Sequence, residues 1–172
     1  MKTKEEIVQN WLPRYTGQAL ENFGEYILLT NFSNYVKMFA EWNKVEVIGE
    51  GKPMQCATAD NISIINFGMG SPTAATVMDL LSAIQPKAVL FLGKCGGLKK
   101  RNKLGDLILP IAAIRGEGTS NDYFPPEVPA LPTSAAGDSH ASKWRQAIAR
   151  TKRVIVINDI SFLLPGLSLA WT

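Results

Sequence analysis

A lysine stands among glycines at the end of an apolar run, in the segment LGKCGG at residues 92–97. Glycines let the backbone turn sharply and let a ligand approach the main chain closely. Because ligands of open α/β sheets bind where strands end at their carboxyl edges, an ammonium at this place can bind an anion or a sugar phosphate. Lys94 is therefore a candidate anion-binding residue, although the same pattern also fits a tight turn with a solvated lysine.

A second glycine turn, GMGSP at residues 68–72, precedes a predicted helix. Its N–H groups could bind an anion at the helix N-terminus. A Gly-x-Gly pair is weak evidence for dinucleotide binding, and Thr73 stands where the third glycine of that fingerprint belongs. We therefore do not favour a dinucleotide site.

A third polar segment, RGEGTS at residues 115–120, follows another apolar run. Polar side chains between glycines at a strand end are typical of a site, and also of a structural turn whose carbonyl groups are satisfied by an arginine. We favour the structural turn slightly for Arg115.

These segments must be positioned by strands and helices. The strand beginning at Ala88 is apolar throughout, as expected for a strand covered on both faces. Residues 62–92 form a strand–helix–strand unit, which predicts a right-handed crossover and parallel pairing. The other predicted strands are 26–29, 45–48, 54–58 and 107–114, and the predicted helices are one capped by Thr3 and ended by Pro13, one at 34–42, and one with Ser71 as N-cap to about residue 84.

The composition is that of an ordinary globular chain, with 46% hydrophobic and 19% charged residues and a formal net charge of +3. The basic residues cluster only at 99–103, a predicted solvated loop, and at 145–153, a predicted helix end. A nucleic-acid interface would need a larger basic face with interleaved aromatics, so it is not favoured. Cys56 and Cys95 have no metal-type spacing. No apolar run approaches the roughly 20 residues that span a bilayer, and no signal peptide is indicated, so we expect a cytoplasmic protein without membrane partners.

Taken together, the segments resemble the nucleoside phosphorylase and nucleosidase superfamily, of the purine nucleoside phosphorylase and uridine phosphorylase type. The resemblance is carried by NFGMGSPTAA at 66–75, LGKCGG at 92–97, GDLI at 105–108 and RGEGTS at 115–120. Within the family, the segments FLGKCGG and NDYFPPE (121–127) are similar to those of the short bacterial AMP nucleosidases. The resemblance implies a three-layer α/β/α fold with a mixed, largely parallel sheet, incomplete in this chain.

The departures from the family imply the chemistry. Phosphorylases of the family hold free phosphate with arginines, whose guanidinium groups match phosphate oxygens. Phe91 and Tyr35 stand at two of these arginine positions, and Asn31 stands where a glycine usually lies near phosphate. Water is then the expected nucleophile. Lys94 replaces a hydroxyl that often contacts phosphate, and we expect it to contact the 5′-phosphate of a nucleotide.

The implied reaction is hydrolysis of AMP to adenine and ribose 5-phosphate through an oxocarbenium-like state. Cys95 and Gly96 would line the ribose and base, and Met69 would pack near the sugar. The resemblance implies no cofactor or metal, a small nucleotide or nucleoside as substrate, and a homo-oligomer of the hexamer type. The predicted substrate-binding residues are Asn31, Gly68, Met69, Gly70, Lys94, Cys95, Gly96, Arg115 and Thr119.

The catalytic residues stay unassigned, because the Met-Glu ribose clamp and the late aspartate of the family are not found. The likeness runs from about residue 26 to 132. We therefore predict the amino-terminal part of a nucleoside phosphorylase/nucleosidase domain at 1–132 and a divergent tail at 133–172. The tail is predicted to contain a short helix at 141–152 and one strand at 153–158. The tail belongs either to a truncated or frame-shifted relative or to a real divergent ending.

In both cases we expect weak or absent catalysis by this chain alone. A nucleoside phosphorylase and a non-catalytic nucleotide-binding remnant are the alternative functions.

Overall fold

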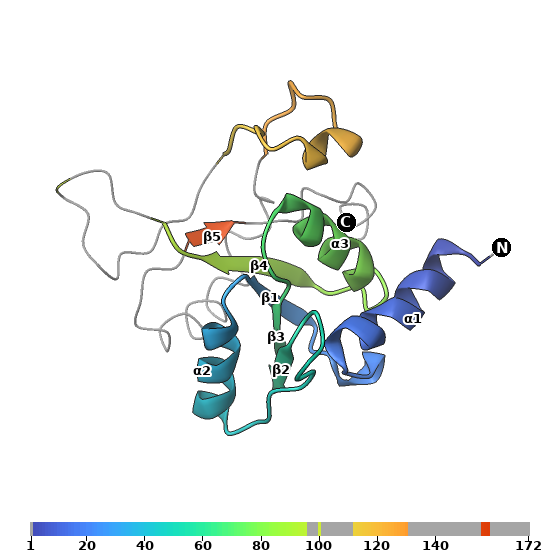
Figure 1. Ribbon diagram of the computed structural model, residues 1–172, viewed down its shortest axis with the longest axis vertical. Coiled ribbons are helices and arrows are strands. Elements are labelled where there is room, and N and C mark those ends of the chain that lie inside the picture. The colour runs from blue at the N-terminus through green and yellow to red at the C-terminus, as the bar shows by residue number, and fades with distance from the viewer. Residues whose placement is uncertain (1, 96–99, 101–111, 131–155, 159–172) are drawn as a thin grey trace.

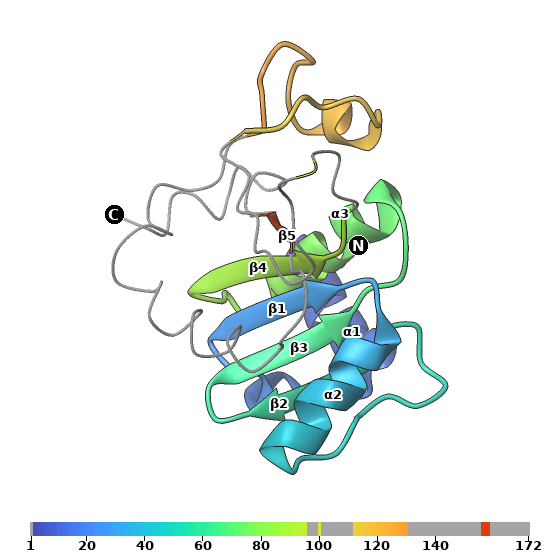
Figure 2. The same cartoon turned by 90° about the vertical axis from the view of Figure 1, so that its left-hand side faces the viewer.

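The computed structural model of the protein describes residues 2–95, 100, 112–130 and 156–158. Within these residues, a five-stranded sheet of order β2-β3-β1-β4-β5 is covered by helices on both faces (Figure 1, Figure 2). These layers confirm the predicted α/β/α fold class. The elements are α1 Lys4–Thr16, η1 Leu20–Asn22, β1 Tyr26–Thr30, α2 Ser33–Asn43, β2 Cys56–Ala59, β3 Ile62–Asn66, α3 Ser71–Leu81, β4 Ala88–Gly93, η2 Thr119–Asp122 and β5 Val156–Asn158.

The centre of the sheet is parallel and its edges are antiparallel. Strand β1 pairs in parallel with both β3 and β4, whereas β2 pairs antiparallel with β3, and β5 with β4. Strands β3 and β4 thus run parallel, as predicted, but β1 lies between them. The carboxyl ends of three neighbouring strands consequently meet at one side of the sheet.

The hydrophobic core lies on both faces of β1, whose five residues are all buried. Because side chains alternate between the faces of a strand, Ile27 packs with Leu12 of α1 and Val77 of α3, whereas Leu28 packs with Val36 of α2. In Figure 2, α2 lies in front of the sheet and α1 behind it. Cover on both faces explains why the sequence of this strand is apolar at nearly every position.

Helix α1 begins as predicted and ends later than predicted. Thr3 and Glu6 form the expected capping box, in which each side chain accepts the other residue's backbone N–H. The prediction that Pro13 ends the helix is wrong, because the helix continues to Thr16. Proline removes only one N–H donor, and the burial of Thr16 packs the last turn against the core. The helix stops where Gly17 adopts a left-handed conformation, with φ 78.

Three further local predictions need correction. Gly70, and not Ser71, is the N-cap of α3, because the Ser71 hydroxyl lies 2.9 Å from the hydroxyl of Thr119 instead of capping the helix; the helix also ends at Leu81 rather than near residue 84. Residues 45–48 form no named strand, and only Ile48 makes an isolated bridge, to Cys56. The valines of that segment pack their side chains under α2, which explains their apolar character without strand pairing.

Strand β5 lies within the strand predicted at 153–158, and it pairs with β4 at the edge of the sheet. Several other predictions fall outside the described residues. These are Gly96, the basic loop at 99–103 apart from Lys100, the strand at 107–114 apart from its last three residues, the tail helix at 141–152 and the domain division at residue 132.

Candidate functional site

Three predicted site segments meet where β1, β3 and β4 end. The register pairs Thr30, the last residue of β1, with Asn66 of β3 and with Leu92 of β4. The chain therefore leaves the sheet on the same side at Asn31, at residue 67 and at Lys94. We call this side, with Asn31, Gly68 and Lys94 and their immediate neighbours, the carboxyl edge. Ligands of open α/β sheets bind at such an edge.

The ammonium of Lys94 lies over two aromatic rings at the carboxyl edge. Its Nζ atom is 4.5 Å from the ring centroid of Phe32 and 5.3 Å from that of Tyr35. Both distances are within the roughly 6 Å over which a ring face attracts a cation. The register explains the contact with Phe32, because Phe32 and Lys94 each follow a residue of the Thr30–Leu92 pair by two positions.

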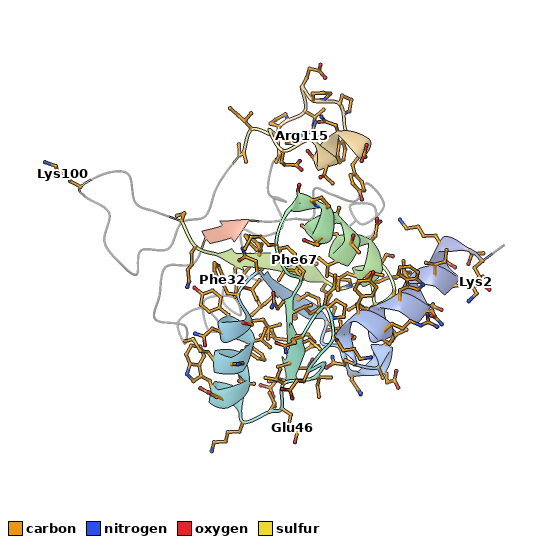
Figure 3. All side chains as sticks on the ribbon, in the orientation of Figure 1. Lys2, Phe32, Glu46, Phe67, Lys100 and Arg115 are labelled. Carbon is orange, nitrogen blue, oxygen red and sulfur yellow. The ribbon has the colours of Figure 1, made fainter. Side chains whose placement is uncertain are left out.

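The two rings are held in place by the start of α2. Phe32 is the N-cap residue of that helix (Figure 3). Tyr35 lies in the first turn of the helix. The ring centroids are 5.5 Å apart in an edge-on arrangement, which aromatic pairs prefer. Tyr35 is buried in the apolar cluster beneath α2, whereas Phe32 is half-buried. The fold thus fixes the ring faces before any ligand binds.

Lys94 has no carboxylate partner within the described part of the chain. The ion pairs found there join Lys4 to Asp79 and Lys87 to Glu25. A ring face attracts a cation without cancelling its charge, so the positive charge of Lys94 stays available to an anion. The described residues contain no cluster of His, Cys, Asp and Glu suited to a metal ion. None of the described helices is long and apolar enough to cross a bilayer.

Asn31 contributes an unsatisfied polar atom to the same edge. Its side-chain Oδ1 is buried and has no hydrogen-bond partner among the described residues. The neighbouring Thr30 hydroxyl, in contrast, accepts the N–H of Phe32 at 3.2 Å. Most buried polar atoms in proteins have a partner, so this orphan acceptor makes Asn31 a candidate ligand contact at the carboxyl edge.

The glycine turn after β3 is open toward solvent. Asn66 Oδ1 accepts the N–H of Gly68 at 3.1 Å, and Gly68 and Gly70 have φ 84 and 96. A Cβ added to Gly68 would meet no atom within 4 Å, so the backbone conformation, rather than crowding, favours glycine there. Met69 is 78% exposed. Its predicted packing near a sugar remains a prediction.

Aromatic side chains stand at the two positions where the resemblance noted in the sequence predicts arginines for a phosphorylase. Tyr35 lies on the α2 face of the sheet, as described above. Phe91 lies on the opposite face, half-buried, with its ring centroid 5.7 Å from that of Phe67. Neither position presents a guanidinium group to a phosphate.

Arg115 lies in the loop of residues 112–130 and binds that loop's own backbone (Figure 3). Its Nε donates to the carbonyl of Val128 at 2.7 Å, and the terminal nitrogens donate to the carbonyls of Ser120, Phe124 and Pro125. These contacts are those of a structural turn, the alternative favoured from the sequence.

Thr119 and Glu117 attach the same loop to the start of α3. The Thr119 hydroxyl lies 2.9 Å from that of Ser71, and the carboxylate of Glu117 accepts the N–H groups of Thr119 and Ser120 at 2.9 and 3.0 Å. The nearby Ser120 and Ser71 hydroxyls, together with these N–H groups, lower the pKa of Glu117 to about 2. The Thr119 segment and the glycine turn are thereby joined.

The structure brings some of the predicted site residues together and leaves others apart. Asn31, Gly68 and Lys94 share the carboxyl edge, the exposed Cys95 follows Lys94, and Thr119 reaches the edge through Ser71. The sequence analysis missed Phe32 as a partner of Lys94 and Glu117 as the anchor of the loop. The signal for the first was present, since two aromatic residues three positions apart begin a helix directly after the central strand.

Comparison with known proteins places these features in a family. Residues 25–159 match the family model described as "Phosphorylase superfamily". The match begins near the expected start and continues beyond residue 132. A crystal structure of AMP nucleosidase from Bacteroides thetaiotaomicron VPI-5482 is 48% identical, with a TM-score of 0.73, covering 98% of this chain and 85% of that chain.

Curated relatives match shorter parts of their own length. AMP nucleosidase of Escherichia coli (strain K12) is 27% identical over 155 residues, which cover 69% of this chain and 32% of that protein. Guanosine phosphorylase of Halorubrum lacusprofundi is 35% identical over 72 residues, covering 42% of this chain and 30% of that protein. The chain thus spans about a third of the length of these relatives.

Proposed function

Because the chain belongs to the phosphorylase superfamily, we propose that it carries the nucleotide-binding part of an AMP nucleosidase-like N-ribosyl hydrolase. In the proposed reaction, the N-glycosidic bond between the ribose C1′ and the adenine breaks and the oxygen of water bonds to C1′. A proton passes to the adenine as it leaves. The products are adenine and ribose 5-phosphate.

One observation carries the proposal: the Lys94 ammonium lies at the carboxyl edge over Phe32 and Tyr35, with no carboxylate partner among the described residues. A phosphate monoester is a dianion near neutral pH and matches an uncompensated ammonium. The orphan Oδ1 of Asn31 adds a hydrogen-bond acceptor at the same edge of the sheet. Gly68 and Gly70 offer an open backbone turn at the same edge.

The choice of water over phosphate as the nucleophile rests on what surrounds the lysine. Free phosphate is held best by guanidinium forks, which can bind two oxygens at once. At the two positions in question the chain presents the aromatic rings of Tyr35 and Phe91. The 48% identity to a solved AMP nucleosidase also supports water as the nucleophile.

The test is to measure AMP and adenosine binding to the chain by calorimetry, and to analyse the products formed from AMP with and without inorganic phosphate. We expect tighter binding of AMP than of adenosine, and slow release of adenine and ribose 5-phosphate that phosphate does not accelerate. We expect slow turnover because the Met-Glu ribose clamp and the purine-protonating aspartate that the resemblance implies are not found in this sequence. Equal affinity for AMP and adenosine in the wild type, or an unchanged preference for AMP in Lys94→Met, would contradict the proposal.

A nucleoside phosphorylase is the second candidate. It is favoured by the 35% identity to a guanosine phosphorylase over 72 residues. The Lys94 ammonium would then hold inorganic phosphate. Release of base from a nucleoside that requires phosphate and yields ribose 1-phosphate would decide for this alternative.

We further propose a cytoplasmic homo-oligomer of the hexamer type, without nucleic-acid or membrane partners. The support is the superfamily membership together with the modest net charge of +3. Sedimentation velocity of the purified chain tests the assembly. A monomer across the accessible concentration range would contradict it.

A further inference from the structure

Two aromatic rings lie beneath the Lys94 ammonium, and one of them, that of Phe32, is only half-buried. Of the two rings beneath it, that of Phe32 is nearer, with 4.5 Å from Nζ to the centroid against 5.3 Å for Tyr35. Tyr35 is buried and packs with the core residues beneath α2, so its presence is already explained by stability. Phe32 packs only at the margin of that cluster, and its face is turned to the lysine.

A ring and a carboxylate hold an ammonium with different consequences. A carboxylate fixes the group and cancels its charge, whereas a ring face fixes it and leaves the charge intact. A lysine side chain otherwise loses much rotamer freedom when its end is ordered, which weakens ligand binding. A ring beneath the ammonium meets part of that cost before the ligand arrives.

We propose that Phe32 is a positioning residue, which holds the Lys94 ammonium for the 5′-phosphate and thereby sets the preference for a nucleotide over the corresponding nucleoside. This inference rests on the proposed function, because it assumes that Lys94 contacts that phosphate. It goes beyond the proposed function in assigning the selectivity to a residue that does not itself touch the substrate.

The experiment compares the affinities for AMP and for adenosine in the full chain, in three single variants, and in the double variant that combines Phe32→Leu with Lys94→Met. Phe32→Leu removes the ring and keeps an apolar side chain of similar size. Phe32→Tyr keeps the ring face and is the conservative rescue. Lys94→Met removes the charge and tests the proposed function by itself. Urea unfolding of each variant establishes that the fold is retained, and Phe32→Met, which also removes the ring and keeps an apolar side chain, replaces Phe32→Leu if the leucine variant unfolds.

We expect Phe32→Leu to weaken AMP binding about fivefold, the effect of losing about 1 kcal/mol of cation–π attraction. Adenosine affinity stays unchanged, since adenosine has no phosphate. Phe32→Tyr keeps the ratio of the two affinities within about twofold of wild type. In the Lys94→Met background, Phe32→Leu has no further effect on AMP, because the ring then has no ammonium to position.

Other outcomes separate the two proposals. Loss of AMP preference in Lys94→Met together with an unchanged ratio in Phe32→Leu overturns the role of Phe32 and leaves the proposed function standing. An equal loss of AMP and adenosine affinity in Phe32→Leu also overturns it, because the ring would then serve only the fold. An unchanged ratio in Lys94→Met overturns the proposed function, and this inference falls with it.

A spectroscopic measurement tests the contact directly. An ammonium above a ring face places the adjacent methylene group in the shielding region of the ring. We therefore expect the Lys94 ε-methylene NMR signals to lie upfield of ordinary lysines in wild type and in Phe32→Tyr. In Phe32→Leu they move toward the ordinary position. The same shift in all three proteins would contradict the contact.

Discussion

Two lysines flank the same strand, and their surroundings differ. Lys87 precedes β4 and Lys94 follows it. The Lys87 ammonium lies 2.8 Å from the carboxylate of Glu25, and this hydrogen bond raises the pKa of Lys87. The Lys94 ammonium lies over rings, with no carboxylate partner in the part of the chain that the structure describes. The first lysine ties two strand ends together, and the second keeps its charge for a ligand.

The same contrast extends across the two ends of the parallel strands. Glu25, Asn61 and Lys87 each stand one residue before the register set of β1, β3 and β4, and we call them the amino edge. Glu25 accepts from both Asn61 and Lys87, and Asn61 accepts the Glu25 N–H at 2.8 Å. Polar groups there satisfy one another. At the carboxyl edge an ammonium and an amide oxygen do not, which separates a structural edge from a binding edge.

The largest expected effect concerns the packing of two glycines. A Cβ on Gly24, which adjoins the amino edge, would lie 2.4 Å from the backbone carbonyl carbon of Asn61, whereas one on Gly68 would meet nothing within 4 Å. We expect Gly24→Ala to cost on the order of 3 kcal/mol of unfolding free energy through overpacking. Gly68→Ala should cost about 1 kcal/mol, for its left-handed backbone alone. Urea denaturation measures both, and equal losses would remove the contrast in packing.

The next effect separates the two lysines by function. Lys94→Met should weaken AMP binding roughly 10- to 100-fold, the range for losing a hydrogen bond between charged groups. Lys87→Met is the matched control, because it removes an ammonium at the other end of β4. It should leave AMP affinity unchanged and cause a small loss of thermal stability that salt diminishes. Calorimetric titration with AMP and thermal melts at two salt concentrations give both readouts.

The opposite pattern for the two lysines, or an equal effect of both on AMP affinity, would mean that the carboxyl edge does not bind the phosphate. The comparison of the edges would then describe only how the fold is held together.

A smaller effect is expected from two asparagines. Asn61 makes two hydrogen bonds with Glu25, and Asn31 Oδ1 makes none with the described residues. Asn61→Ala should therefore cost about 1 kcal/mol of unfolding free energy, whereas Asn31→Ala should stay within about 0.5 kcal/mol of wild type. Urea denaturation of the two variants measures this difference. A larger loss in Asn31→Ala would show that Asn31 serves the fold rather than a ligand.

Much of the fold followed from local pattern. The apolar runs placed β1, β3 and β4 because strands covered on both faces leave few polar positions, and the Thr3–Glu6 pair placed the start of α1. The prediction that α1 ends at Pro13 was wrong because a proline near a helix end removes one N–H donor without breaking a packed last turn. The strand predicted at 45–48 was wrong because burial under α2 produces the same apolar sequence pattern as strand pairing.

In the site too, local sequence identified some residues, whereas contacts between distant segments could not be predicted. Lys94 was identified from its own neighbours, since glycines on both sides of a lysine at a strand end are a local pattern. Its contact with Phe32 depends on the register between β1 and β4, which joins residues 62 positions apart and is set by packing of the whole sheet. The hydroxyl contact between Ser71 and Thr119 likewise needs the position of the loop on α3.

The smallest effect concerns the carboxylate of Glu117, near the carboxyl edge. Like the carboxylate of Glu25 at the amino edge, it accepts hydrogen bonds from neighbouring groups. Glu117 accepts the N–H groups of Thr119 and Ser120, and its pKa is lowered to about 2. A lowered pKa in the folded loop means that ionisation stabilises the loop above the unfolded value of about 4.3. This contribution is lost as pH falls from there through about 2.

The amide NMR shifts of Thr119 and Ser120 should therefore titrate with a midpoint near 2 and show no titration in Glu117→Gln. A midpoint near the unfolded value would mean that the carboxylate is solvated, and the loop would then share the unsatisfied polar character of the carboxyl edge.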